Sequence, residues 1–170
     1  MGLTIENSPS WRRVLPVGAL VMLLLLLVQF LAGMFVNLFV GIPNHPGTSG
    51  AAVSGALIGV AWAITGGAPA LVFHTALGLL LTIGSLVLAV VAIVSGRRRA
   101  LVVTTVVGLL GVLGADLNGV AFLNYTVDKA TYLMSVGFSV AAAAYVVTLF
   151  FAREPVVHRL ETASQPTAGG

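Results

Sequence analysis

A long stretch without any charged side chain is the feature that most limits how this chain can fold. No Asp, Glu, Lys or Arg occurs between Val14 and Gly96. A segment of that length could not cover a water-soluble domain, because the surface of such a domain needs charged side chains. Charged residues make up 8% of the sequence and hydrophobic residues 58%, whereas about a quarter of a soluble protein is charged. The chain is therefore expected to be an integral membrane protein with a single domain.

Four apolar segments are long enough to cross a bilayer, which takes about 20 residues of helix. Backbone groups in hydrocarbon must bond within their own segment or in a closed barrel, and none of these segments alternates with the two-residue period of a barrel strand. Helices are therefore predicted, at about 17–40, 69–95, 101–122 and 130–151. The predicted fold class is all-α, a four-helix transmembrane bundle.

A fifth apolar segment, at about 51–64, is too short to cross the membrane comfortably. Counting it as a crossing would also move the arginines at 97–99 to the outer side. Membrane proteins concentrate Lys and Arg in their cytoplasmic loops, so this topology is disfavoured. We expect a short interfacial or re-entrant helix on the outer face, between the first and second spans, with Trp62 anchored at headgroup level.

The arginines indicate how the chain is oriented. They flank the spans as Arg12 and Arg13 before the first, Arg97, Arg98 and Arg99 between the second and third, and Arg153 and Arg159 after the fourth. Placing all of them in the cytoplasm leaves Lys129 outside. We therefore expect a multi-pass protein of the bacterial cytoplasmic (inner) membrane, with a cytoplasmic segment at 1–13, a transmembrane domain at 14–152 and a disordered cytoplasmic tail at 153–170.

Small and polar residues recur on one face of each predicted span. Membrane helices associate through close packing of small residues and through hydrogen bonds between helices. We therefore expect these stripes to face inward: Gln29, Gly33 and Asn37; His74, Gly78, Thr82 and Ser85; Gly111, Ala115 and Gly119; Asp128, Tyr132, Ser135 and Ser139.

Two ionisable residues, His74 and Asp116, lie within the predicted spans. Such residues are costly in a membrane and are candidates for function. Each is about five or six residues from the outer end of its helix, so at ~1.5 Å per residue both can lie at one level, roughly 8 to 9 Å deep. They either join two helices through a hydrogen bond or form an outer-leaflet pocket. The other candidates for that pocket are Asn37, His45, Asn118, Asn124, Tyr125, Asp128 and Tyr132.

No cofactor or metal is expected, and haem is the alternative. A histidine on a membrane helix can be an axial ligand of haem, but His74 has no good partner, since His45 lies outside the helix and His158 on the far side. A metal held by His45, His74 and Asp116 would have suitable ligands without a diagnostic spacing. The chain has no cysteine, which excludes disulfides and thiolate chemistry.

Three strings resemble a largely uncharacterised family of small bacterial four-pass membrane proteins with an HPG loop and an NGxxFLNYxxD motif. They are FVNLFVGIPNHPG, WAITGGAPALVFHTALGLLL and NGVAFLNYTVDKATYLMSVGF, within residues 30 to 150. The resemblance implies no activity. The positions that match its motifs are His45, His74, Asn118, Asn124, Tyr125 and Asp128.

The residues favour a non-catalytic membrane protein. No nucleophile paired with a base, phosphate-binding loop or pair of catalytic carboxylates is visible, so no catalytic residue is predicted. The expected partners are the lipid bilayer and a homo-oligomer or larger membrane complex, and nucleic acid is not expected. The favoured role is an accessory subunit or sensor with a polar outer-leaflet pocket. The alternatives are a cytochrome-b-like haem or quinone-binding redox component, and a small oligomeric transporter or channel subunit.

Overall fold

The computed structural model of the chain describes residues 9–42, 52–95, 98–125 and 128–152. These residues form helices and no strand, which confirms the predicted all-α class. The helices are α1 (Pro9–Phe39), α2 (Ala52–Thr65), α3 (Pro69–Val94), α4 (Arg99–Tyr125) and α5 (Asp128–Ala152). All except α2 are long and apolar enough to cross a membrane. The short apolar helix expected between the first two spans is α2.

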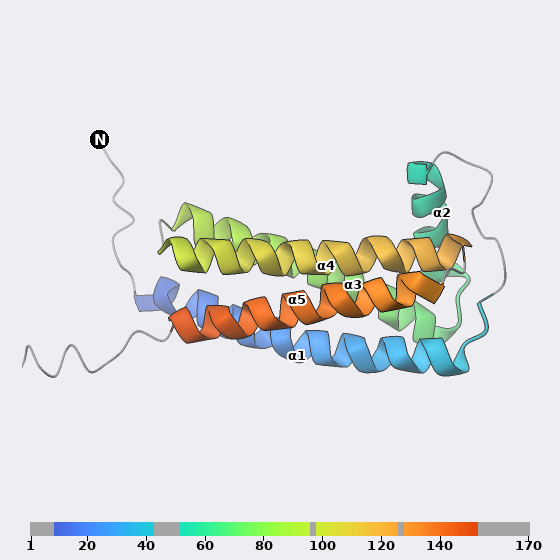
Figure 1. Ribbon diagram of the computed structural model, residues 1–170, viewed down its shortest axis with the longest axis horizontal. Coiled ribbons are helices and arrows are strands. Elements are labelled where there is room, and N and C mark those ends of the chain that lie inside the picture. The colour runs from blue at the N-terminus through green and yellow to red at the C-terminus, as the bar shows by residue number, and fades with distance from the viewer. Residues whose placement is uncertain (1–8, 43–51, 96–97, 126–127, 153–170) are drawn as a thin grey trace, which may run out of the picture.

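The four long helices form a bundle in which α1 and α4 face each other diagonally. Helix α1 packs against α3 and α5, and α4 packs against the same two helices. Figure 1 shows α2 at one end of the bundle, nearly perpendicular to the long helices and extending beyond α4, and it contacts α3 and α4. The start of α1 and the end of α5 lie together at the opposite end. The two ends are called the α2 end and the arginine end below, because Arg13, Arg98 and Arg99 lie at the second.

Two helices extend beyond the expected apolar spans. Helix α1 begins at Pro9 rather than near residue 17 and includes Pro16, so its first turns contain polar residues and lack one backbone donor. Helix α4 continues to Tyr125 rather than ending near residue 122. Hydropathy marks only the apolar part of a helix, whereas backbone hydrogen bonding continues into the polar flanks. Helix α3 begins at Pro69, a position where the missing N–H of proline costs nothing.

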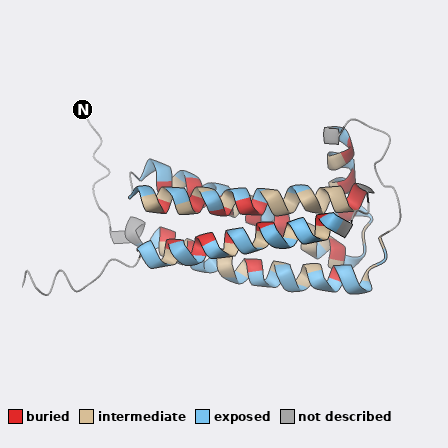
Figure 2. Ribbon diagram, viewed as in Figure 1, coloured by how far each residue is buried: buried red, intermediate tan, exposed pale blue. Residues whose placement is uncertain are grey.

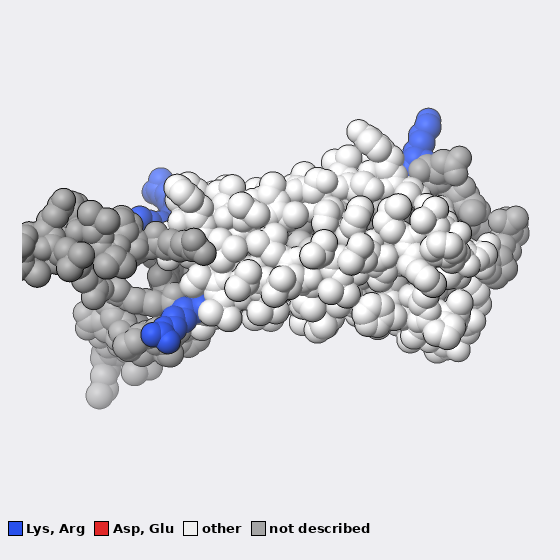
Figure 3. Space-filling model, turned by 90° about the horizontal axis from the view of Figure 1, so that it is seen from below, with Lys and Arg blue, Asp and Glu red and all other residues white. Residues whose placement is uncertain are grey.

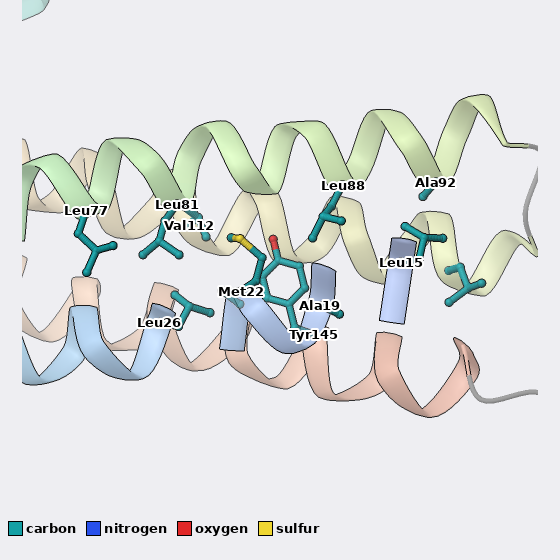
Figure 4. Close-up of a cluster of buried hydrophobic side chains, with 12 residues drawn as sticks. Leu15, Ala19, Met22, Leu26, Leu77, Leu81, Leu88, Ala92, Val112 and Tyr145 are labelled. Atoms are coloured by element: carbon teal, nitrogen blue, oxygen red, sulfur yellow. The ribbon is translucent and has the colours of Figure 1, made fainter. Parts of the chain in front are cut away.

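The main core lies toward the arginine end and consists of buried side chains. It joins side chains from all four long helices around Tyr145, the largest fully buried side chain (Figure 4). Leu15 and Ala19 of α1 and Leu88 and Ala92 of α3 are also buried there. A smaller cluster of Val36, Ala63, Leu71 and Leu123 attaches α2 to the bundle.

The outside of the bundle is apolar along its length. Large hydrophobic side chains such as Leu117, which is 71% exposed, point outward on every long helix (Figure 2). In the face shown in Figure 3, Lys and Arg occur only near the two ends, and the surface between them carries no charge. Such a band suits the hydrocarbon of a bilayer and would be poorly hydrated in water.

Helices α4 and α5 approach most closely where two glycines face each other. A Cβ atom at Gly111 would lie 2.7 Å from the backbone nitrogen of Ala141, and one at Gly137 would lie 2.7 Å from that of Ala115. Neither position can hold a side chain without moving the two backbones apart. This is the close contact of small residues through which membrane helices associate.

The polar stripe expected to face inward on α5 instead lies mainly on the exposed side of the helix, with Ser135 at the edge of the cavity described below. Tyr132 is 70% exposed, and Ser135 and Ser139 are also exposed. The two serine hydroxyls donate to the carbonyls of Thr131 and Ser135 in their own helix, so they need no partner on another helix. The buried face of α5 instead carries Gly137, Ala141, Tyr145 and Thr148, because small residues allow the closest contact with α4.

Candidate functional site

A cavity of about 230 Å³ lies inside the bundle, in the half nearer α2. All four long helices line it, and α2 contributes Val60. Most of its wall is apolar, with polar side chains at a few points. These are Gln29, Asn37, His74, Thr75, Asp116, Thr131 and Ser135. A concave, mostly apolar space with a few polar groups is the usual form of a small-molecule site.

Gln29 of α1 and His74 of α3 face each other across the bundle. The amide nitrogen Nε2 of Gln29 lies 3.5 Å from Nε2 of His74. Gly33 leaves room for the imidazole, since a Cβ there would lie 2.8 Å from His74 Cε1. Gln29 Oε1 and His74 Nδ1 are buried without a hydrogen-bond partner. Buried polar atoms are normally paired, so two unpaired atoms on adjacent cavity-lining residues need an explanation.

Asp116 of α4 is held by α3. The hydroxyl of Thr82 donates to the Asp116 carboxyl group and also lies 3.1 Å from the carbonyl of Gly78. Gly78 lies between Asp116 and Gln29, because a Cβ there would be 3.4 Å from Asp116 Oδ1 and 3.2 Å from Gln29 Nε2. The polar groups therefore follow one another along α3 as a row, from His74 to Thr82.

His74 and Asp116 line the same cavity but do not bond to each other. Thr82, which binds Asp116, lies two helical turns from His74, roughly 12 Å along α3. Gln29 occupies the space between them. Of the two possibilities considered for His74 and Asp116, a direct hydrogen bond is therefore not formed, and the side chain that lies 3.5 Å from His74 is Gln29.

Three of the other predicted pocket residues lie away from the cavity wall. Asn118 donates to the carbonyl of Gly114 in its own helix at 2.7 Å. Asn124 is 4% exposed and lies beside Gly59 of α2, so it contributes to the contact between α2 and α4. Tyr132 points outward. Among the predicted residues whose side chains the structure describes, Asn37, His74 and Asp116 line the cavity.

The remaining predicted residues cannot be placed. His45 lies outside the described residues, and so do the side chains of Tyr125 and Asp128. Within the part of the chain that is described, no three His, Asp or Glu side chains come together as metal ligands would. The metal considered above requires His45 and so lies outside the described part.

Gln29 and Thr82 were not predicted as pocket residues. Each nevertheless belongs to a stripe that the sequence shows, Gln29 one turn before Gly33 and Thr82 one turn after Gly78. The helical period places both on the inward face of their helices. Gln29 lines the cavity, and Thr82 lies beside it through its bond to Asp116.

Comparisons of this chain with protein-family models, with curated proteins and with solved structures yield no match.

Toward the arginine end the cavity is followed by the core around Tyr145, whose described interior also holds the buried hydroxyls of Ser85, Thr105 and Thr148. Beyond Thr82, the bundle interior is filled by the core around Tyr145, with Leu81, Leu88 and Leu15 packed together (Figure 4). The nearby hydroxyls of Ser85, Thr105 and Thr148 each donate to a backbone carbonyl of their own helix. The arrangement is thus a chamber closed toward one end of the bundle, which suits holding a molecule better than passing one through.

Proposed function

We propose that this chain is a non-catalytic protein of the bacterial inner membrane that binds a small molecule in the cavity, as a sensor or an accessory subunit. The observation that carries this proposal is the pair of unpaired buried atoms on Gln29 and His74. Leaving a buried polar group unsatisfied costs about 1–3 kcal/mol. A bound molecule that paired with both would recover that cost, so the cavity is more stable when occupied.

The arginines support an outward-facing position for the cavity. Arg13, Arg98 and Arg99 belong to one end of the bundle, whereas Lys129 begins α5 at the other. If the end with more basic residues faces the cytoplasm, the cavity lies in the outer leaflet and α2 lies along the outer surface. A molecule from outside the cell or from the outer leaflet would then reach it first.

The alternative functions have less support. A channel or transporter needs a path, and the core around Tyr145 fills the half of the bundle that a path would cross. A haem exceeds a drug-sized ligand in extent, and pockets for such ligands have about 300–1,000 Å³, more than the cavity provides. His74 would also need a second axial ligand.

Ligand capture can be tested by identifying what co-purifies with the protein in its native lipid. Gly78→Leu would fill the space between Gln29 and Asp116. Gly114→Leu is the matched control in α4, because a Cβ there meets nothing within 4 Å and Gly114 does not line the cavity. We expect mass spectrometry to find one small molecule per chain in the wild-type protein and in Gly114→Leu. The amount of that molecule should be at least tenfold lower in Gly78→Leu.

The same preparations can also give results that contradict the proposal. Circular dichroism and elution volume should be unchanged in both variants. An identical extract from Gly78→Leu and wild type, or no bound molecule in either, would contradict the proposed function. A Soret absorption band that disappears in His74→Ala would indicate haem instead.

A further inference from the structure

We infer that the ligand is a neutral, lipid-soluble molecule with a hydroxylated ring as its head, of the phenol or quinol class, and that it enters from the lipid between α1 and α5. This inference rests on the binding function proposed above. It is drawn from the charge, hydrogen-bonding capacity, size and open side of the cavity.

The cavity favours a neutral head. Neither Lys nor Arg is among its lining residues, so an anionic headgroup would find no counter-charge. Its one acidic group, Asp116, already has Thr82 as a partner. The Thr82 hydroxyl has a single proton and two neighbouring acceptors, Asp116 and the carbonyl of Gly78. A protonated Asp116 carboxyl would instead donate to Thr82 and leave the Thr82 proton for Gly78, and the site would then be uncharged.

Gln29 and His74 together demand one donor and one acceptor from the ligand. With Gln29 Nε2 donating to His74 Nε2, the unpaired atoms are the acceptor Oε1 and the donor Nδ1–H. With the amide turned over, the unpaired atoms are an amide N–H and an acceptor Nδ1. Either arrangement leaves one of each, and a hydroxyl group supplies both. The terminal torsions of both side chains are soft, so each can turn toward an oxygen in the cavity.

The size of the cavity suits a ring rather than a whole lipid. An engineered apolar cavity of about 150 Å³ holds benzene, and this one has about 230 Å³. It therefore has room for a six-membered ring with small substituents. Phe30, Phe122 and Phe138 form part of the wall, and aromatic faces and edges pack well against another ring. A hydrocarbon tail attached to the ring would have to lie outside.

We place the open side between α1 and α5, because exposed side chains of both helices line the cavity. Met34 and Asn37 of α1 and Ser135 of α5 line the cavity and are also exposed at the surface. Further toward the arginine end, Phe30 and Phe138 stack with ring centroids 5.1 Å apart and close the gap. Since the surface around the opening is apolar and faces lipid, a tail can remain in the bilayer while the ring occupies the cavity.

Three probes with the same tail test the chemistry of the head: 4-decylphenol, decylbenzene and N-decylpyridinium. Binding is measured as the excess of labelled probe in lipid nanodiscs that contain the protein over empty nanodiscs. We expect saturation at one 4-decylphenol per chain, with an affinity about tenfold or more above that of decylbenzene, because one or two hydrogen bonds are gained. Gln29→Leu and His74→Phe should each reduce that preference several-fold.

The route is tested with two tryptophan variants of exposed serines on α5. Ser135 lines the cavity, whereas Ser139 lies one turn away, is equally bonded within its own helix and does not line it. We expect Ser135→Trp to slow both the binding and the release of 4-decylphenol at least tenfold, because the indole covers the opening. The affinity of this variant should stay within twofold of the wild-type affinity. Ser139→Trp should change either rate less than twofold.

The outcomes separate this inference from the function on which it rests. Equal binding of 4-decylphenol and decylbenzene, or stronger binding of N-decylpyridinium, overturns the phenol class while a ligand pocket survives. Unchanged rates in Ser135→Trp, or a loss of affinity without slower exchange, overturn the lateral route. Failure of all three probes in wild type, together with no co-purified molecule, removes the binding function as well.

Discussion

At the scale of single residues, the polar groups of the cavity differ in how completely they are satisfied. Asp116 has Thr82 as a partner, whereas Gln29 and His74 each keep one buried atom without one. A satisfied group in a membrane interior mainly joins helices, because its bonding capacity is used within the protein. An unsatisfied group is still able to bond to something else. The two groups of polar residues therefore have different roles. Asp116 links α4 to α3, whereas Gln29 and His74 remain available to a ligand.

The linking role of Asp116 leads to a double-mutant prediction. Thr82→Val leaves the buried carboxyl without its partner and should lower the free energy of unfolding by about 1–3 kcal/mol. Thr82→Val combined with Asp116→Leu replaces both groups by apolar ones and should recover most of that loss. Unfolding by SDS in mixed micelles, followed by circular dichroism, measures each value. Strictly additive effects of the two substitutions would show that the two groups do not interact.

At the scale of helices, the bundle is divided into a tight pair and looser contacts. Gly111 and Gly137 let the backbones of α4 and α5 touch, so these two helices form its most closely packed unit. Helix α1 joins α5 through larger side chains, among them the stacked Phe30 and Phe138. Large side chains hold helix axes further apart than glycine does. Met34 and Asn37 of α1 are both exposed and line the cavity, so the cavity is open beside α1.

The tight pair should be sensitive to a single methyl group. Gly111→Ala places a Cβ 2.7 Å from the backbone nitrogen of Ala141, so α4 and α5 must move apart, at a cost of about 1–3 kcal/mol for overpacking. Gly114→Ala in the same helix meets open space and should be neutral or slightly stabilising, since alanine is the better helix former. The same SDS titration compares them. Equal stability of the two variants would contradict the close contact.

At the scale of the whole molecule, the bundle has a filled half and a hollow half. The filled half, around Tyr145, lies toward the arginine end, and the hollow half lies beneath α2. The filled half therefore contributes most of the van der Waals contacts that stabilise the bundle, because atoms that line a cavity lack contacts on one side. The hollow half can then adapt to a ligand without loosening the rest of the bundle. Helix α2 crosses the end of that half and is held there by the cluster of Val36, Ala63, Leu71 and Leu123.

The orientation of the molecule can be measured directly because the chain has no native cysteine. Ser95→Cys places a thiol at the arginine end and Lys129→Cys places one at the α2 end, and both positions are exposed. A membrane-impermeant maleimide should label Lys129→Cys in spheroplasts, and label Ser95→Cys only after the membrane is permeabilised. The reverse pattern would place the cavity in the inner leaflet.

The sequence by itself determined that four helices form and which segments they occupy. A charge-free stretch of this length is compatible with the lipid bilayer rather than with water. In the bilayer, the backbone N–H and C=O groups must form their hydrogen bonds within each segment. It also identified the short helix as a separate element by its length. These conclusions follow from hydropathy along the chain, and they need no knowledge of neighbours.

Only the tertiary structure decided which faces meet. Tyr132 and Ser139 belong to a polar stripe in the sequence, yet they face outward. The Ser139 hydroxyl bonds within its own helix, while Gly137 and Ala141 make the close contact with α4. Likewise, Gln29 rather than Asp116 is the partner of His74. Pairings of this kind depend on how four helices are rotated and offset against one another, and in lipid that is settled by the fit of their surfaces rather than by hydrophobicity.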